Sequence, residues 1–298
     1  MTDQRSVSLG AIPDIASRFS QEESLTMFER MCYIRHFEGR VKRAYDEKII
    51  KMPVYLSVGQ EAVAVALSIA FPKAALFAQH RAHDLYLAYG GDPRALVDEL
   101  LHRKSGCAGG MGGSASIHSP AIGMFGHSGL LGDQVPIAAG YAQGSGKNTV
   151  CLFGDATAEE DYALSSFGYT ATKKLPVLFI CVDNNLSILT EVGVRRSWNA
   201  AEVAGAFGLK SVDITDDPWV LMHHIRNMAG SLPAFINVRV VRHLWHAGTG
   251  TDSAPEWDRF ALVRAELGRL GYADEADERE RAAYAAADAV WDAALAVK

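Results

Sequence analysis

The sequence predicts an α/β fold, a parallel sheet flanked by helices, with helical extensions at the N- and C-terminal ends. The main evidence is a strand–helix–strand pattern between residues 149 and 182, in which two apolar runs enclose an amphipathic helix. Strands joined in this way pair in parallel through a right-handed crossover. Helical periodicity in 21–44 and 256–297 predicts the extensions. Hydrophobic residues make up 49% of the 298 positions, enough for a sizeable core.

Three helices are predicted before this pattern. The first, 21–44, follows Ser20, a suitable N-cap because a glutamate stands three residues later. The second, 59–70, is small and apolar enough to be buried, and we expect it to form a subunit contact. The third, 94–103, has Pro93 at its first helical position.

The segment 106–140 holds ten of the chain's 27 glycines and has little periodicity, which is typical of a functional loop. The strand–helix–strand unit follows, with strands at 149–153 and 177–182 and a helix at 158–174. Weaker patterns predict helices at 199–206 and 219–229 and a strand at 234–241. We divide the chain into an N-terminal arm and start of the domain (1–105), an α/β core (106–245), and an active-site loop with a helical tail (246–298).

The composition excludes several classes of protein. The net charge of -6 gives no reason to expect nucleic acid or an anionic membrane as a partner. The four cysteines, Cys32, Cys107, Cys151 and Cys181, form no CxxC pair and are typical of reduced core thiols. The N-terminus lacks the apolar segment of a signal peptide, and no apolar run is long enough to span a bilayer. We therefore expect a cytoplasmic protein.

Polar residues follow both strands of the central unit. Asp155 comes after the first strand, and Asn184 and Asn185 come after the second. Ligands of open parallel sheets bind beyond the carboxyl ends of the strands, so these side chains should meet at the ligand edge. Carboxylate and carboxamide oxygens suit Mg²⁺. Because magnesium also binds phosphate oxygens, we expect a diphosphate-bearing cofactor beside it.

Five motifs carry a family resemblance. Gly154-Asp155-Ala156 followed by Asn184-Asn185 resembles the thiamine-diphosphate motif, a GDG followed some two dozen residues later by NN. The other four resemble, in order and spacing, the α subunit of 2-oxo acid dehydrogenase E1 components of the pyruvate, branched-chain and acetoin types. They are GQEAVAVAL (59–67), HRAHDLYLAYGGDPRAL (80–96), GCAGGMGGS (106–114) and GLLGDQVPIAAG (129–140). The resemblance covers roughly 22–252 and implies the thiamine-diphosphate-binding fold.

The resemblance implies roles for individual residues. Asp155, Asn185 and the main-chain oxygen of Ser187 correspond to the Mg²⁺ ligands, with Asn184 as the alternative to Asn185. Arg81 corresponds to the diphosphate-binding arginine, whose planar fork can bind two phosphate oxygens. The other implied cofactor-binding positions are His80, Gly129, Leu131, Gly154 and Ala156. His246, in RHLWH, corresponds to the histidine that faces the reacting thiazolium, and His83 and His127 are further catalytic candidates.

Several residues depart from the family pattern. Ala156 replaces the second glycine of GDG, which costs about 1 kcal/mol if that turn needs a positive φ. The asparagine pair lies one residue later than in close E1 α subunits, a spacing nearer to that of transketolases. Leu186-Ser187 replaces the common Gly-Tyr, and Asp133 stands where alanine is common. These changes leave the substrate and the acceptor open.

The resemblance implies an enzyme that uses thiamine diphosphate and Mg²⁺ to decarboxylate a 2-oxo acid. The acyl or aldehyde fragment would pass to an acceptor such as a lipoyl group, an acyl carrier protein or a small metabolite. In the family, a second α/β domain supplies the carboxylate that activates the cofactor, and the residues after Val241 are too few for one. A β-type E1 subunit in an α₂β₂ heterotetramer is therefore implied.

Three glutamates are expected to have structural roles rather than to supply this carboxylate. Glu61 should fix helix packing or a subunit contact, and Glu159 and Glu160 should complement a helix N-terminus. Ketol transfer by a split transketolase, and a cofactor-binding scaffold subunit without catalysis, are the alternative functions.

Overall fold

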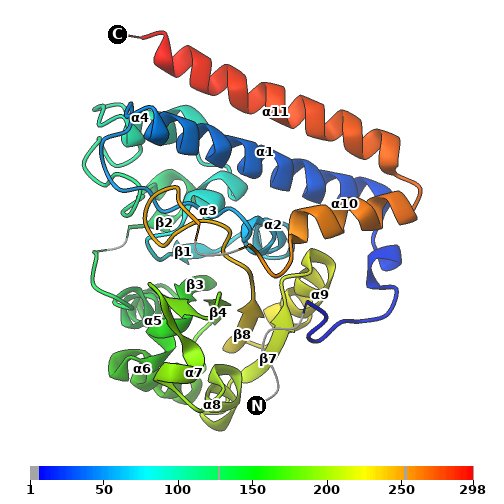
Figure 1. Cartoon of the computed structure of the whole chain (residues 1–298). Helices are drawn as coiled ribbons and strands as arrows, with labels where there is room; N and C mark the ends of the chain where they lie inside the picture. Colours follow the sequence, from blue (N-terminus) through cyan, green and yellow to red (C-terminus); the bar gives the residue numbers. More distant parts are fainter. Residues whose placement is uncertain (1–6, 127, 252–253, 298) are drawn as a thin grey trace.

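The computed structural model describes residues 7–126, 128–251 and 254–297. Its centre is a six-stranded sheet in the order β2-β1-β3-β4-β8-β7, in which every neighbouring pair is parallel (Figure 1). The predicted α/β class is confirmed. The strands are β1 Ala75–Phe77, β2 Met124–Phe125, β3 Thr149–Gly154, β4 Val177–Asp183, β7 Lys210–Thr215 and β8 Ala234–Arg239. A separate antiparallel hairpin joins β5 Leu186–Ser187 to β6 Thr190–Glu191.

The alternation of side chains along the strands divides the core in two. On one face of the sheet, Leu152 and Ile180 belong to a core that includes α2 and α9. On the other face, Phe153 and Phe179 pack with residues of α5, α6 and α8. Both faces are covered, which is why β3 and β4 are nearly continuous apolar runs. These helices are α2 Glu61–Ala70, α5 Gln134–Ser145, α6 Asp161–Lys173, α8 Ala200–Ala206 and α9 Pro218–Ala229.

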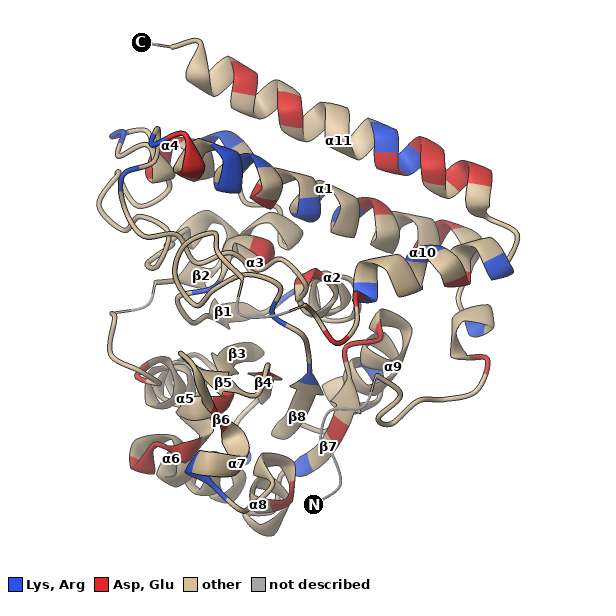
Figure 2. Cartoon of the chain, in the orientation of Figure 1, with Lys and Arg blue, Asp and Glu red and all other residues tan. Residues whose placement is uncertain are grey.

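Long helices form a further layer beyond α2. Figure 1 shows α1 Gln21–Asp46 alongside α11 Ala273–Leu295, with α10 Arg259–Arg269 next to them. The ring centroids of Phe37 and Trp291 lie 5.6 Å apart between α1 and α11. Charged residues are frequent on these outer helices (Figure 2). The remaining helices are α3 His83–Ala88, α4 Pro93–Leu100 and α7 Val192–Arg195.

The predicted helix starts are largely confirmed. The hydroxyl of Ser20 accepts a hydrogen bond from the Glu23 N–H at 3.2 Å, and Pro93 is the first residue of α4. The predicted helix at 158–174 begins at Asp161 instead, because Asp155–Glu159 forms a short 3-10 helix. In the part of the chain that the structure describes, no helix has both the length and the apolar composition needed to cross a membrane.

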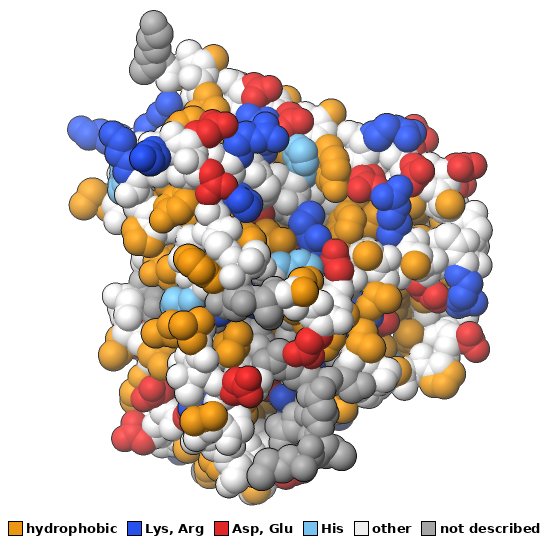
Figure 3. Space-filling view, viewed as in Figure 1, with side chains coloured by type: hydrophobic (Ala, Val, Ile, Leu, Met, Phe, Trp, Pro, Cys, Tyr) orange, Lys and Arg blue, Asp and Glu red, His pale blue; other side chains and the backbone are white. Residues whose placement is uncertain are grey.

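One prediction was wrong. Helix α2 cannot offer its apolar surface to another subunit, because its residues 61–68 are buried within this chain against α1, α3 and α9. The segment 106–140 is largely loop, as expected from its weak periodicity, and α5 begins near its end at Gln134. Strands β1, β2 and β7 were not predicted. On the surface, hydrophobic side chains gather between the outer helices and the sheet on the face shown in Figure 3.

Candidate functional site

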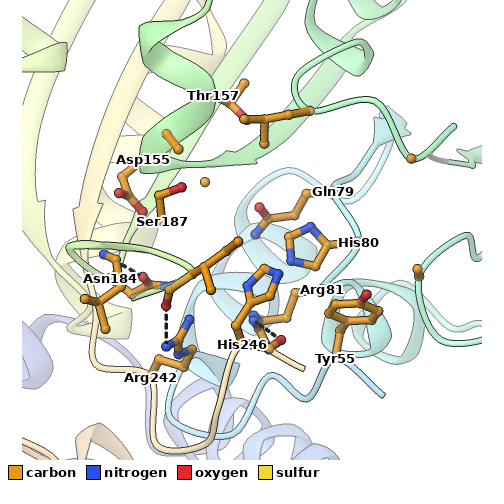
Figure 4. Close-up of a pocket in the computed structure, with 17 residues that line it drawn as sticks. Tyr55, Gln79, His80, Arg81, Asp155, Thr157, Asn184, Ser187, Arg242 and His246 are labelled. Atoms are coloured by element: carbon orange, nitrogen blue, oxygen red, sulfur yellow. Dashed lines mark hydrogen bonds between the residues drawn. The ribbon is translucent and has the colours of Figure 1, made fainter. Parts of the chain in front are cut away.

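Four neighbouring strands of the sheet end at one cavity of about 340 Å³. Residues 79–81 follow β1, 154–157 lie at the end of β3, 184–188 follow β4, and Arg242 and His246 follow β8. Figure 4 shows these side chains facing one another across the cavity. This is the carboxyl edge of a parallel sheet, where ligands of open α/β folds bind.

The cavity collects most of the residues that the sequence singled out. Those that line it are His80, Arg81, Gly129, Leu131, Gly154, Asp155, Ala156, Ser187 and His246. Asn184 lines the cavity and Asn185 is not among the lining residues. His83 is buried elsewhere, and His127 lies outside the described residues.

Asp155 forms the acidic wall of the cavity. Its side chain is buried, and burial together with the nearby Asp183 raises the pKa of the Asp155 carboxyl to about 6, although Arg195 and Arg196 lower it. Arg195 donates to the carboxylate of Asp155, and Arg196 Nη1 donates to its main-chain oxygen at 2.7 Å. A buried carboxylate in this position can hold a cation.

The two adjacent asparagines after β4, Asn184 and Asn185, have different surroundings. Asn184 faces the cavity, and its Oδ1 accepts from the Leu186 N–H at 3.1 Å. Asn185 has a φ of 65°, and its Oδ1 accepts from the Val192 N–H at 3.2 Å. Asn184 therefore belongs to the cavity and Asn185 to the base of the β5–β6 hairpin.

Two arginines form the opposite, basic wall. The buried Arg81 donates from Nη1 to the Leu56 oxygen at 2.6 Å and from Nη2 to the His246 oxygen at 3.0 Å. Burial and the neighbouring Arg242 lower the pKa of Arg81 to about 10, which still leaves it charged at neutral pH. Arg242 donates to the Ile188 oxygen at 3.0 Å (Figure 4). Two fixed positive charges here suit an anionic ligand.

Three rings lie together beside Arg81. The His246 centroid is 5.1 Å from that of His80, and the Tyr55 ring stands edge-on to His80 at 4.9 Å and to His246 at 5.6 Å. Tyr55 reaches this position because the chain before α2 runs beside the chain after β8. The main-chain N–H of His243 donates to the Val58 oxygen at 3.1 Å, which joins the two segments.

Sequence reasoning missed Tyr55, Gln79 and Arg242 as cavity residues. A signal existed for the last two, because Gln79 precedes the matched His80-Arg81 pair and Arg242 begins the RHLWH segment. Tyr55 precedes the matched GQEA motif by several residues, and only the pairing of two distant loops brings it to the site.

His83 lies in a closed polar cluster rather than in the cavity. Its Nδ1 is 3.0 Å from Glu38 Oε2 and its Nε2 is 2.9 Å from the hydroxyl of Ser114. Glu38 also accepts from the N–H and hydroxyl of Ser57. Burial alone would raise the pKa of the Glu38 carboxyl, but His83 and these hydrogen bonds hold it below its usual value. His83 thus ties α3 to α1 from a position without solvent access.

The structure also shows the surroundings of Glu61, Glu159 and Ala156, which the sequence singled out. Glu61 is buried, pairs with Arg35 and accepts from the Gly59 N–H at 3.1 Å, so it does fix helix packing. Glu159 pairs with two arginines that follow the hairpin, and Glu160 is the N-cap residue of α6, although its side chain makes no capping hydrogen bond. Ala156 lies in the 3-10 helix and not in the left-handed region, so it carries no such backbone strain.

A cation at this cavity would depend on few ligands. Over the described ranges, no three His, Cys, Asp or Glu side chains group closely enough to hold a metal. The oxygens available are the Asp155 carboxylate, the Asn184 amide and main-chain oxygens of the hairpin. This sparse set of hard oxygens fits Mg²⁺, which keeps waters and binds substrate phosphates.

The fold and the cavity define a class: an α/β protein with a ligand site at the carboxyl edge of its sheet, acidic on one wall and basic on the other. A sequence profile of the dehydrogenase E1 component family matches residues 29–225. The chain belongs to this family.

Relatives carry the same family name. The chain is 31% identical over 255 residues to a protein of Zymomonas mobilis named pyruvate dehydrogenase E1 component subunit alpha. The matched region covers 79% of this chain and 71% of that protein. It is 34% identical over 186 residues to the human somatic mitochondrial form of that subunit. This second match covers 60% of this chain and 47% of the human protein, so the chain spans about half of that relative.

Proposed function

We propose that this chain is the α-type subunit of an enzyme that uses thiamine diphosphate and Mg²⁺ to decarboxylate a 2-oxo acid. The fragment that remains is transferred to an acceptor. The observation that carries the proposal is the pairing, in one cavity, of Asp155 and Asn184 on one wall with Arg81 and His246 on the other. Family membership supports the same reading.

The residues of the cavity fit a metal-bound diphosphate. Asp155 and Asn184 would bind the cation, and the family's spacing then assigns the main-chain oxygen of Leu186 instead of that of Ser187. Arg81 would hold the diphosphate, because its two main-chain hydrogen bonds orient its fork. The absence of a side chain at Gly154 keeps the wall open, since a Cβ there would lie 3.0 Å from Gln79 Oε1.

When bound, thiamine diphosphate supplies the nucleophilic carbon and the electron sink of the reaction. The chain's own residues bind and orient the reactants. His246, held by its main-chain bond to Arg81 and flanked by Tyr55 and His80, can donate or accept a proton beside the substrate. His127 stays an untested candidate for this role.

A β-type E1 subunit is proposed as the partner, because the relatives are named as alpha subunits of an E1 component. It would supply the carboxylate that activates the cofactor, as the resemblance implies. The α₂β₂ assembly and a lipoyl or acyl carrier protein as acceptor are further parts of this proposal. Two observations favour this proposal over the alternatives: Asn184 in the cavity fits an E1-like spacing, and Ala156 shows no backbone strain.

Calorimetry of thiamine diphosphate with Mg²⁺ tests the proposal on the chain purified with its β-type partner. Asp155→Asn should lower the affinity about ten- to a hundredfold, since losing one charged contact costs roughly 1.5–3 kcal/mol. Asp161→Asn, an exposed change at the start of α6, is the matched control and should bind like the wild type. Equal affinity of Asp155→Asn and wild type would refute the metal site.

A further inference from the structure

The carboxylate proposed for the cation already has a cationic partner, Arg195. The Arg195 guanidinium donates to Asp155 and to Glu159, and its Nε donates to the Thr190 oxygen at 3.2 Å. The side chains of Arg195 and Asp155 are 13% and 3% exposed, so water screens this pair weakly. Arg195 therefore binds one of the two side-chain oxygens, Oδ2, of the residue proposed to hold the divalent cation.

Arg196 approaches the same two acidic residues in a different way. Its Nη1 donates to the main-chain oxygen of Asp155 at 2.7 Å and to Glu159 Oε1 at 3.0 Å. Within the described part of the chain, Arg196 makes no hydrogen bond to the Asp155 carboxylate. Both arginines thus bring a positive charge to Asp155 and Glu159. Only Arg195 binds a side-chain oxygen of Asp155.

We infer that Arg195 is the counter-ion of Asp155 when no divalent cation is bound, and that cation binding moves Arg195 onto Glu159 alone. The inference rests on the proposed metal site at Asp155. A guanidinium and a divalent cation repel each other strongly in a shielded site, which disfavours their binding to one carboxylate at the same time. Glu159 already forms an ion pair with Arg195 and would keep this pair after Arg195 leaves Asp155.

The segment that carries Arg195 is suited to such a movement. It follows the β5–β6 hairpin, whose turn holds Ile188 at a φ of 55°, an unfavourable conformation for a β-branched residue. Leu189 and Val194 are 68% and 78% exposed. Val192 and Arg196 are the buried residues of α7 and its end, so a shift of Arg195 would disturb little packing.

Titration of the full chain with Mn²⁺ alone, followed by the electron paramagnetic resonance signal of free Mn²⁺, tests the inference without any enzyme assay. Arg195→Met should bind Mn²⁺ about tenfold more tightly, because a competitor is removed. Arg196→Met is the matched charge control and should change the affinity by less than about threefold. Arg195→Lys should give a smaller gain than Met, since an ammonium cannot bridge both carboxylates as the fork does.

The outcomes separate the inference from the proposed function. If Asp155→Asn binds Mn²⁺ as the wild type does, the metal site itself is wrong. If Asp155→Asn loses Mn²⁺ but Arg195→Met gains nothing, or gains no more than Arg196→Met, the competition is refuted and the metal site stands. Thermal unfolding of each variant checks its fold. If Arg195→Met does not fold, Arg195→Lys takes its place: a gain in Mn²⁺ affinity supports the competition, and no gain refutes it.

Discussion

Asn184 and Asn185 illustrate how one residue of register decides a ligand. The last residue of β4 is Asp183, whose Oδ1 accepts from the Asn185 N–H at 2.9 Å and whose Oδ2 accepts from Arg239 Nη1 at 2.6 Å. This anchored carboxylate fixes the turn, with Asn184 toward the cavity and Asn185 toward Val192. The motif NN alone does not contain this information, because it depends on where the strand ends.

The two asparagines should therefore respond differently to alanine. Asn184→Ala should weaken the binding of thiamine diphosphate with Mg²⁺ by about tenfold, and it should lower stability less than Asn185→Ala because it loses only the hydrogen bond from the Leu186 N–H. Asn185→Ala should keep the affinity but lower the free energy of unfolding by about 1 kcal/mol, since it loses a hydrogen bond and places alanine at positive φ. Calorimetry and urea unfolding measure the two effects. The reverse order would make Asn185 and the oxygen of Ser187 the ligands.

At the residue scale, the sequence predicted those cavity residues that directly follow predicted strands or lie in matched motifs. Asp155 and His246 are examples, because a strand end or a spaced motif marks each of them. Tyr55 and the pairing of Arg195 with Asp155 were beyond reach. Both depend on contacts between segments far apart in the chain, and local patterns contain no distance between such segments.

The glycine-rich loop after α4 has a structural explanation. The carboxylate of Glu99, a buried residue of α4, accepts four main-chain N–H bonds at 2.8–2.9 Å. The donors are Ala108, Gly110, Gly112 and Gly113. Gly110 and Gly113 have φ values of 75° and 61°, which other residues rarely adopt. The first part of the loop is thus folded around a carboxylate, while Gly129 and Leu131, later in the segment, reach the cavity.

Removal of this carboxylate should destabilise the loop and the helix together. Glu99→Ala should lower the free energy of unfolding by about 3–5 kcal/mol, because buried N–H groups lose a charged acceptor. Glu99→Gln should cost less, since one carbonyl oxygen still accepts. Urea unfolding measures both, and Glu278→Ala, at an exposed position of α11, should stay within about 0.5 kcal/mol of wild type. A loss below about 1 kcal/mol in Glu99→Ala would contradict this role.

At the element scale, long elements with a regular period were predictable and short ones were not. β3 and β4 are buried on both faces and read as apolar runs, and α1 shows helical periodicity with a cap. β1 has three residues, too few to show any period. β7 lies at the edge of the sheet with four of its six residues exposed or partly buried, so its sequence lacks a continuous apolar run.

Across the whole molecule, large hydrophobic side chains stand exposed around the cavity. Leu130 is 62% exposed, Ile188 59%, Leu189 68% and Trp245 48%. They come from three loops: the one before α5, the turn of the β5–β6 hairpin, and the loop after β8. Single exposed hydrophobic residues are ordinary, but several around one ligand cavity mark an interaction surface. The β-type subunit of the proposed function would cover this surface and close the site.

Association with the β-type subunit should therefore depend on this surface. Leu189→Asp should weaken association at least about tenfold, because it would bury an unpaired charge in the contact. Leu262→Asp, on α10 and 41% exposed in the chain alone, is the matched control and should associate normally. Sedimentation of mixtures measures association, and release of CO₂ from 2-oxo acids measures turnover.

The chain alone should bind thiamine diphosphate weakly and release no CO₂, and addition of the β-type subunit should restore both tight binding and CO₂ release. Sustained decarboxylation by the isolated chain would overturn the shared site, whereas normal association of Leu189→Asp would move the contact to another face.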